Sequence, residues 1–521
     1  MIILGIGGVL HDAAAAILKD GELVAAVEEA KIARTRREGG LPHAAVQACL
    51  ALAEAAPAEI DYVAVARPVG ANTHLELRAR FPSARIVVVD HHAAHAASAY
   101  FASPFESATV LTLDRAGDLR CGARWRASGN SLTLEREAYA PDSLADLYSR
   151  VAELAGFTAG AEEHKLQWMS AAGDGRLRDV FGEMMPALPG RWPHIDRSFL
   201  DPGRLTHGGF SAKFFTRLGL DDGAAIPESL GPSLAAGLQK AVEAAIIDMA
   251  GEGDNLCLAG GLGYNALLVA ALERSGRFRN VFVQPSAGNA GTAFGAVFHV
   301  WHTVLGEARR AGIGNFCLGP GYSAEQIKQV LENCKLRFRY LRTTGEIVDT
   351  AVAILGERQI VAWMHGRMEF GPRALGNRSI LASPLDPYST ENLNRFIKHR
   401  ESFRKFAASV PVEVSAEYFD AGSNARFLST AGKVRPAHRE RFSAAILGGD
   451  WIRVHTVSQQ DNPMYWNLLH AAGRATGLPV LYNTSFNLFG DPLVCTPRDA
   501  VRSFYSSGID AMVVGNFLLQ K

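Results

Sequence analysis

A strand pattern that occurs twice in the first 140 residues constrains the fold more than any other feature of this sequence. The apolar run MIILGIGG precedes a hairpin pattern that turns at Asp20-Gly21. About a hundred residues later, ATVLTLDRAGD again predicts a strand that ends in an acidic, glycine-bearing turn, and a second hairpin pattern turns at Gly129-Asn130. The repetition predicts a duplicated α/β domain in the first part of the chain.

Other segments fit the same duplicated plan. Residues 41–60 predict a helix, and DYVAVA and RIVVVD predict the next two strands. Two glycine-rich turns, LAGGLGYN and GNAGTAFGAV, stand where a strand gives way to a helix, and there backbone amides and the helix dipole can bind phosphate or ribose. The pattern resembles the actin, sugar kinase and Hsp70 architecture, which binds phosphates between two similar halves.

The chain is long enough for more than this one domain. It has 521 residues and 48% hydrophobic composition, which allows two or three domains with their own cores. Glycines and a proline accumulate in GEARRAGIGNFCLGPGYSAEQ, and the segments that follow contain more arginine and aromatic residues. We therefore expect an N-terminal domain over residues 1–318 and a C-terminal domain over residues 319–521.

Charge and cysteine usage narrow the class of partner. Lys plus Arg and Asp plus Glu are equal at 53 each, so no excess of basic charge indicates nucleic acid or anionic lipid as a partner. The six cysteines form no CxxC pair, which is typical of a reduced, cytoplasmic protein. The first ten residues lack a basic leader, and we interpret them as a buried strand rather than a signal peptide or membrane span. Small molecules are the expected partners.

The segment DHHAAHAASAYF places three histidines within six positions and is a candidate metal site. If a helix begins here, His91 and His95 project from one face one turn apart, whereas His92 points elsewhere. The alternative is a helix start followed by surface histidines. Asp114, at the end of the next strand, and Asn289, in the second glycine-rich turn, are candidate third and fourth ligands. Nitrogen and oxygen ligands together favour iron, zinc or manganese over calcium.

Basic and small polar residues gather in three segments of the second half, HGRMEFGPRALGNRSILASP, IKHRESFRKFAASV and LYNTSFNLFGDPLVCTPRDA. A solvated basic face would explain two or three of the cations, but not the whole set. Arginine forks and a lysine ammonium group neutralise phosphoryl oxygens at short range, so the set predicts a clamp for a polyphosphate or acyl phosphate. Its members are Arg373, Arg378, Lys398, Arg400, Arg404, Ser485 and Asn487.

These segments together resemble the O-carbamoyltransferase family, which includes the nodulation, cephalosporin, novobiocin and tobramycin carbamoyltransferases. The resemblance covers nearly the whole chain and rests chiefly on GRMEFGPRALGNRSIL and NTSFNLFGDPLVCTPRDA, with HDAAAA, DHHAAHAASAYF, EHK and LAGGLGYN in the expected order. It implies an α/β protein whose N-terminal domain has the duplicated, ribonuclease H-like actin and sugar kinase (ASKHA) fold, similar to the metal-containing tRNA threonylcarbamoyl-transferase subunit. It also implies a YrdC-like α+β C-terminal domain.

The resemblance implies a reaction at two sites. The C-terminal domain would form carbamoyl adenylate and pyrophosphate from carbamoyl phosphate and ATP, with Mg²⁺ as the helper of ATP. Lys398 and Arg404 would be catalytic there. Nucleotide and substrate would be bound by Arg373, Arg378, Arg400, Arg453, Asn483, Ser485 and Asn487.

The N-terminal domain would then transfer the carbamoyl group to a hydroxyl of a specialised metabolite or sugar. The resemblance implies His11 as the general base on the acceptor. It also implies a divalent metal ion, with iron favoured over zinc or manganese. Lys165 would lie near the phosphate of the adenylate. The implied ligands of the metal are His91, His95, Asp114 and, where the family has aspartate, Asn289, and the implied adenosine-binding residues are Gly260, Gly261 and Asn265.

Three departures from the family pattern bear on the acceptor pocket more than on the adenylation site. Asn289 replaces an aspartate, Ala13 replaces a serine, and QWMSAAG, with Gln167 and Trp168, replaces MGLAPYG. A sugar-type kinase and a nucleotide-binding sensor with a degenerate metal site are the alternative functions. A hydrogenase-maturation carbamoyl adenylate enzyme is chemically close, but it would need an acylphosphatase segment and CxxC zinc fingers. The sequence determines neither the acceptor nor whether the chain acts alone or as a homodimer.

Overall fold

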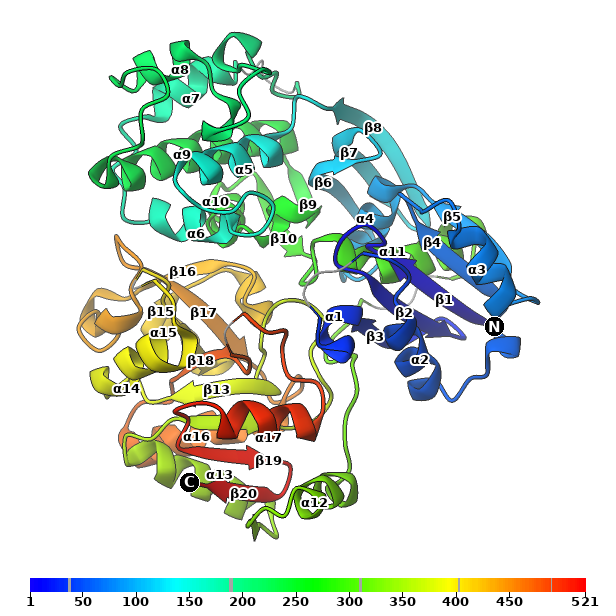
Figure 1. Ribbon diagram of the computed structural model, residues 1–521, viewed down its shortest axis with the longest axis vertical. Coiled ribbons are helices and arrows are strands. Elements are labelled where there is room, and N and C mark those ends of the chain that lie inside the picture. The colour runs from blue at the N-terminus through cyan, green and yellow to red at the C-terminus, as the bar shows by residue number, and fades with distance from the viewer. Residues whose placement is uncertain (36–38, 187–190, 309–311, 402, 489) are drawn as a thin grey trace.

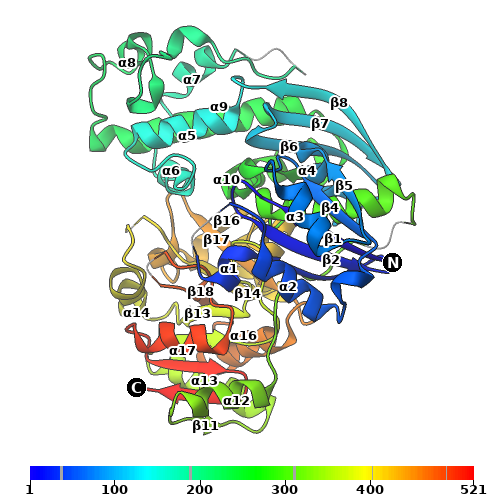
Figure 2. The ribbon, with the colours of Figure 1, turned by 45° about the vertical axis from the view of Figure 1, so that its right-hand side comes forward.

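The computed structural model describes residues 1–521 except 36–38, 187–190, 309–311, 402 and 489. Its strands form two five-stranded sheets and one ten-stranded sheet in a mixed α/β fold (Figures 1 and 2). The excluded residues include 309–311 of the glycine-rich joint, and Ser402 and Phe489 of two basic segments. Among the helices of the described residues, none combines the length and the apolar character that a membrane span requires.

The first sheet has the strand order β3-β2-β1-β4-β5. Strands β1 to β3 pair antiparallel, whereas β1, β4 and β5 pair parallel. The hairpin expected at Asp20-Gly21 joins β2 to β3. The bounds of the strands are β1 Ile2–Gly7, β2 Ala14–Lys19, β3 Glu22–Glu28, β4 Tyr62–Ala66 and β5 Arg85–Val89, and those of the helices are α1 Glu29–Ala33, α2 His43–Leu52 and α3 Thr73–Arg80.

The helix expected over residues 41–60 is shorter in the structure. Helix α2 ends at Leu52, and Pro57 starts a separate 3-10 turn, η1 (Pro57–Glu59). Proline has no backbone N–H to continue the helical hydrogen bonds, and its ring crowds the preceding turn. An alanine-rich pattern alone therefore overestimated the length of this helix.

The second sheet repeats the plan of the first, with the order β8-β7-β6-β9-β10. Strands β6 to β8 pair antiparallel, and β6, β9 and β10 pair parallel. The duplication that the sequence predicted is therefore confirmed at the level of strand order. The bounds are β6 Ser107–Gly117, β7 Arg120–Ser128, β8 Ser131–Tyr139, β9 Gly253–Ala259 and β10 Phe278–Val283.

Two helices pack between these sheets, α4 (His91–Tyr100) and α11 (Thr292–Phe298). Small residues allow the backbones to approach closely. A Cβ atom on Gly5 would lie 2.1 Å from the carbonyl oxygen of Ala293, and one on Gly295 would lie 2.0 Å from that of Ala94. Because interiors are close-packed, larger side chains here would force the sheets apart and move the histidine-bearing helix.

A helical unit follows β8, and its Phe181, Phe210 and Phe214 belong to a hydrophobic core that it shares with strands β6, β9 and β10 of the second sheet. Its helix α6 and the nearby helix α10 face β16 and β17 of the third sheet (Figures 1 and 2). The helices are α5 Leu144–Leu154, α6 Glu163–Ser170, α7 Arg178–Met184, α8 Ala212–Arg217, α9 Gly231–Ala250 and α10 Ala266–Arg274.

The third sheet has the order β11-β20-β19-β12-β13-β18-β14-β17-β16-β15. All of its strands fall within the expected C-terminal domain, although the domain limits themselves stay a prediction. The strands are β11 Arg339–Tyr340, β12 Val361–Met364, β13 Arg378–Ala382, β14 Ala407–Pro411, β15 Phe419–Asp420, β16 Ala431–Val434, β17 Trp451–Val457, β18 Leu481–Ser485, β19 Ala511–Val514 and β20 Phe517–Gln520. The helices are α12 Ala324–Asn333, α13 Thr344–Gly356, α14 Pro387–Asn392, the π-helix η8 Leu393–Lys398, α15 Ser415–Tyr418, α16 Pro463–Thr476 and α17 Pro497–Tyr505.

Candidate functional site

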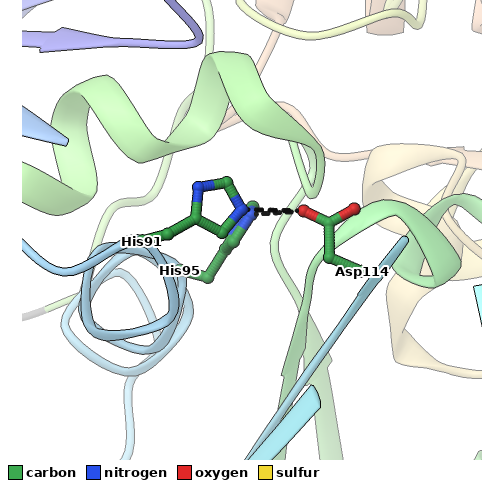
Figure 3. A group of neighbouring side chains, drawn as sticks. All are labelled: His91, His95 and Asp114. Atoms are coloured by element: carbon green, nitrogen blue, oxygen red, sulfur yellow. Dashed lines mark hydrogen bonds and ion pairs between the residues drawn. The ribbon is translucent and has the colours of Figure 1, made fainter. Parts of the chain in front are cut away.

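Helix α4 and strand β6 bring two histidines and an aspartate together (Figure 3). The Asp90 side chain caps the helix by accepting from the backbone N–H of Ala93 at 3.0 Å, so the helix begins where the sequence predicted. Nε2 of His91 lies 2.9 Å and Nε2 of His95 lies 3.1 Å from Oδ2 of Asp114. The three expected ligands therefore converge on one point.

Hydrogen bonds and burial prepare these groups for a cation. Nδ1 of His91 lies 2.9 Å from the backbone oxygen of Arg67, an acceptor that would hold a proton on Nδ1 and free the Nε2 lone pair for a cation bound beside Asp114. Burial by itself raises the pKa of Asp114, but the hydrogen bonds from His91 and His95 hold it well below its ordinary value. A carboxylate and two imidazole lone pairs repel one another unless protons or a cation lie between them.

The donor set fits a divalent metal ion. One atom from each of His91, His95 and Asp114 lies within 4.8 Å of the others, and the set consists of two ring nitrogens and one carboxylate oxygen. This combination suits iron, zinc or manganese. His92 faces away, as expected, because its ring nitrogens contact Oγ1 of Thr112 at 2.8 Å and the backbone oxygen of Arg120 at 3.0 Å.

Two further residues of this predicted site lie on turns. Asn289 begins the turn η6 (Asn289–Gly291), which packs near α4, and its backbone oxygen accepts from Oγ1 of Thr292 at 2.6 Å. His11 is exposed on the turn that follows β1. Metal binding by Asn289 and proton abstraction by His11 stay predictions.

The first glycine-rich turn lies against the end of β6. Gly260 has a φ of +90°, and a Cβ atom on it would lie 2.3 Å from the backbone oxygen of Leu113. A Cβ atom on Gly261 would lie 3.3 Å from Oδ1 of Asp114. Gly260 is therefore required for this close approach, and both glycines stand beside the candidate metal ligands, where adenosine binding was expected.

Asn265 takes part in a buried polar network. Its Oδ1 accepts from the backbone N–H of Leu268 at 3.0 Å and caps α10, and its Nδ2 donates to Oε1 of Gln239 at 2.9 Å. Nε2 of Gln239 donates in turn to Oε1 of Glu243 at 2.7 Å. The structure thus gives Asn265 a structural role, while its adenosine contact stays a prediction.

Replacing Glu243 by glutamine should stabilise the protein at alkaline pH. Burial raises the pKa of Glu243 from 4.5 to about 7. For an acid raised in this way, stability falls as pH rises from 4.5 to about 7, because the unfolded chain ionises before the folded one. Glu243→Gln, which keeps an acceptor for Gln239, should therefore increase the free energy of unfolding at pH 8 by up to about 3 kcal/mol. Urea unfolding at pH 8 and pH 4 tests this; an equal gain at both values would contradict it.

The basic segments of the second half meet where β18 ends. Nζ of Lys398 donates to the backbone oxygen of Ser485 at 2.5 Å, to the backbone oxygen of Asn487 at 2.9 Å and to Oδ1 of Asn487 at 2.7 Å. Oγ of Ser485 donates to the same Oδ1 at 2.7 Å. The lysine and the Ser-x-Asn segment therefore form one unit, as the sequence analysis expected.

Four arginines surround this unit from three segments. Burial, together with the positive charges of Arg373, Arg400 and Arg404, holds the pKa of Arg453 well below its ordinary value. Burial and the charges of Arg400 and Arg404 do the same to Lys398. Concentrated cations of this kind are costly without counter-charges, and bound phosphoryl groups would supply them. The structure thus brings Arg373, Lys398, Arg400, Arg404 and Arg453 into one cationic cluster, and anion binding by this cluster stays a prediction.

Arg378 does not belong to this cluster, contrary to the expectation. Its side chain is fully buried, and its guanidinium group donates to the backbone oxygens of His365, Gly366 and Asn377 through Nη1 and to that of Pro320 through Nη2. It therefore ties together the loops before β13 rather than binding phosphate. A sequence pattern does not distinguish an arginine that binds backbone oxygens from one that faces a ligand.

The loop that carries Arg373 is held from several sides. The carboxylate of Glu369 accepts from the backbone N–H groups of Leu375, Asn377 and Arg378 at 2.8 to 3.0 Å. Nζ of the buried Lys31 donates to the backbone oxygens of Glu369 at 2.8 Å and Gly371 at 2.6 Å, which ties the loop to the first sheet. Asn483 supports the same loop by donating to the backbone oxygen of Ala374 at 3.0 Å. The structure thus gives Asn483 a structural role in this loop, and a ligand contact for it stays a prediction.

Lys165 reaches the second half of the chain through Glu401, which the sequence analysis missed. Its Nζ donates to Oε1 of Glu401 at 2.5 Å and forms an ion pair with Oε1 of Glu162 at 2.6 Å. Glu401 also lies 3.9 Å from Arg404. The ammonium group of Lys165 is thus paired with carboxylates at the edge of the cluster, and a phosphate contact for it stays a prediction.

Comparison with known proteins identifies the family. The pattern described as the carbamoyltransferase N-terminus matches residues 2–81 and 66–298, and the one described as the carbamoyltransferase C-terminus matches residues 352–521. This chain belongs to the carbamoyltransferase family. Membership makes the chain a transferase that acts on carbamoyl groups.

Relatives named in other organisms agree with this membership. The nodulation protein NolNO of Sinorhizobium fredii is 30% identical over 98% of this chain and 79% of its own length. The 3'-hydroxymethylcephem-O-carbamoyltransferase of Amycolatopsis lactamdurans is 31% identical over 52% of this chain and 49% of its own. The solved structure of HypF from T. kodakarensis is 14% identical to this chain, and the match covers 58% of this chain and 48% of HypF. Its TM-score is 0.36.

Proposed function

We propose that this carbamoyltransferase makes carbamoyl adenylate from carbamoyl phosphate and ATP and then transfers the carbamoyl group to a hydroxyl of a specialised metabolite or sugar. The observation that carries the proposal is the cluster of Arg373, Lys398, Arg400, Arg404 and Arg453, whose half-buried, mutually repelling positive charges call for a polyanion. The repeated strand order of the first two sheets supports an ASKHA-type N-terminal domain. A YrdC-like C-terminal domain remains part of the proposal.

The first half-reaction belongs to the cationic cluster. Water hydrolyses carbamoyl phosphate to carbamate and inorganic phosphate, and an oxygen of the carbamate then attacks the α-phosphorus of Mg²⁺-bound ATP. The bond from that phosphorus to the bridging oxygen breaks, and pyrophosphate leaves with the electron pair. Lys398 and the arginines bind the phosphoryl oxygens and neutralise the charge that accumulates on them. Ser485 and Asn487 orient the Lys398 ammonium group through the hydrogen bonds described above.

The second half-reaction belongs to the N-terminal half. His11 accepts the proton of the acceptor hydroxyl, the acceptor oxygen bonds to the carbamoyl carbon, and the bond from that carbon to the phosphate oxygen breaks to release AMP. A divalent metal held by His91, His95 and Asp114 would supply positive charge to orient the adenylate or polarise its carbonyl group. Gly260 and Gly261, whose turn lies against the end of β6 beside Asp114, would bind adenosine.

Incubation of the protein with carbamoyl phosphate, ATP and Mg²⁺ tests the proposal. We expect pyrophosphate release that depends on carbamoyl phosphate, and a mass increase of one carbamoyl group on a hydroxylated acceptor from a screened set. ADP and a phosphorylated acceptor would instead indicate a sugar-type kinase. Pyrophosphate at background level would contradict the adenylation step.

A further inference from the structure

We propose that helix α6 of the N-terminal half forms a wall of the adenylation pocket and that Trp168 on this helix positions the Arg453 guanidinium group for nucleotide phosphate. Trp168 is a positioning residue in this view, because it acts through Arg453. The inference rests on the proposed function, since it assigns a role at the same adenylation site.

Trp168 of the N-terminal half contacts Arg453 of the C-terminal half. The Trp168 side chain is 4% exposed, and Cζ of Arg453 lies 5.3 Å from the centroid of its indole ring. Arg453 lies on β17, between Ala407 of β14 and Ala431 of β16, so it projects from the interior of the third sheet. Figures 1 and 2 both show α6 directly above β16 and β17.

Other contacts hold α6 against the same part of the second half. Lys165 bonds to Glu401 at 2.5 Å, and the rings of Phe157 and Phe403 meet edge to face at 6.3 Å. At the end of the helix, a Cβ atom on Gly448, just before β17, would lie 2.3 Å from the backbone oxygen of Ala171. The helix is therefore packed closely enough to hold the Trp168 ring in one place.

The charge environment explains why Arg453 needs this ring. Its charged neighbours within the cluster are Arg373, Arg400 and Arg404, all of which repel it. Within the described part of the chain, no ion pair brings a carboxylate within 4.0 Å of its guanidinium nitrogens. The electron-rich face of an indole attracts a guanidinium group without neutralising it. Trp168 can thus hold Arg453 in place and leave its charge for a phosphate.

The family pattern MGLAPYG has a glycine where QWMSAAG has Trp168, and a glycine offers no ring to an arginine. The structure places the Trp168 side chain against Arg453 of the cationic cluster, and an effect of this difference on the acceptor pocket stays a prediction.

Two substitutions at Trp168 distinguish a role in positioning Arg453 from a role in packing. Trp168→Phe keeps an aromatic face, whereas Trp168→Leu keeps apolar bulk against its neighbours Leu267 and Leu447 without one. We expect Trp168→Leu to raise the KM for ATP in carbamoyl phosphate-dependent pyrophosphate release about tenfold, with little change in kcat, and Trp168→Phe to stay within about threefold of the wild type. In an Arg453→Met background, Trp168→Leu should add nothing, because the partner of the ring is gone.

Calorimetric titration of the same full-length variants with MgATP gives a second readout that needs no turnover. A tenfold weaker affinity for MgATP in the Trp168→Leu variant, and not in the Trp168→Phe variant, supports the inference. Equal affinities of these two variants for MgATP would overturn it, and so would additive effects of Trp168→Leu and Arg453→Met in the double variant. If the wild type releases no pyrophosphate, the proposed function fails, and the titration still decides on Trp168.

Discussion

Replacement of Lys398 by alanine should lower carbamoyl phosphate-dependent pyrophosphate release about a hundredfold to a thousandfold. The Lys398 ammonium group joins the Ser-x-Asn segment to the arginine cluster through bonds to Ser485 and Asn487. Its loss removes a positive charge from a site where charge develops on phosphoryl oxygens in the transition state, and it removes a donor that Ser485 and Asn487 share. Initial rates measured with a coupled pyrophosphate assay check the result.

Lys405→Ala is the matched control for this substitution. Lys405 lies on the same segment, and burial alone lowers its pKa, with no contribution from the cluster. Its replacement should change the rate less than about threefold, since it removes a charge away from the site. Thermal unfolding of both variants establishes that they are folded. A folded Lys398→Ala variant with the wild-type rate would contradict the role assigned to the cluster.

Replacement of His91 by alanine should separate the two half-reactions. Because His91 and His95 share one carboxylate with their Nε2 atoms, loss of one ring removes a third of the donor set. Bound iron, zinc or manganese, measured by elemental analysis, should fall at least about tenfold. Carbamoyl transfer to the acceptor should fall at least about a hundredfold, whereas pyrophosphate release should persist.

His92→Asn is the control for the metal site. It alters the same helix, but the His92 ring bonds to Thr112 and Arg120 and faces away from Asp114. Metal content and transfer should therefore stay close to those of the wild type. Loss of both half-reactions in the His91→Ala variant would show that adenylation and transfer do not take place at two separate sites as proposed. Unchanged metal content would show that these histidines bind none.

The fold was predictable wherever local pattern decided it. Both hairpins, the first strand and the duplication follow from apolar runs and from Asp-Gly and Gly-Asn turns. The helix at 43–52 was overestimated, because an apolar, alanine-rich stretch continues past the point where Pro57 prevents continuation. The ten-stranded sheet was not predicted strand by strand, since its neighbours are distant in sequence.

The candidate site, too, was predictable from the sequence only where a local pattern decided it. The one-turn spacing of His91 and His95 was readable because it depends on a single helix, and Asp114 followed from the end of the adjacent strand. Arg378 was misassigned and Glu401 was missed, because each role depends on what surrounds the side chain. The guanidinium group of Arg378 donates to backbone oxygens of nearby loops, and the carboxylate of Glu401 accepts from a lysine of the other half of the chain.

The sequence by itself determined the duplicated sheets, the histidine pair and the carbamoyltransferase family, because each of these is written in short segments with local periodicity or spacing. Only the tertiary structure decided which cations share one cluster, which arginine is structural, and that Trp168 of the first half covers Arg453 of the second. These arrangements depend on sheet register and on packing between segments far apart in the chain. Such long-range contacts are selected by the energy of the whole fold and leave no local pattern.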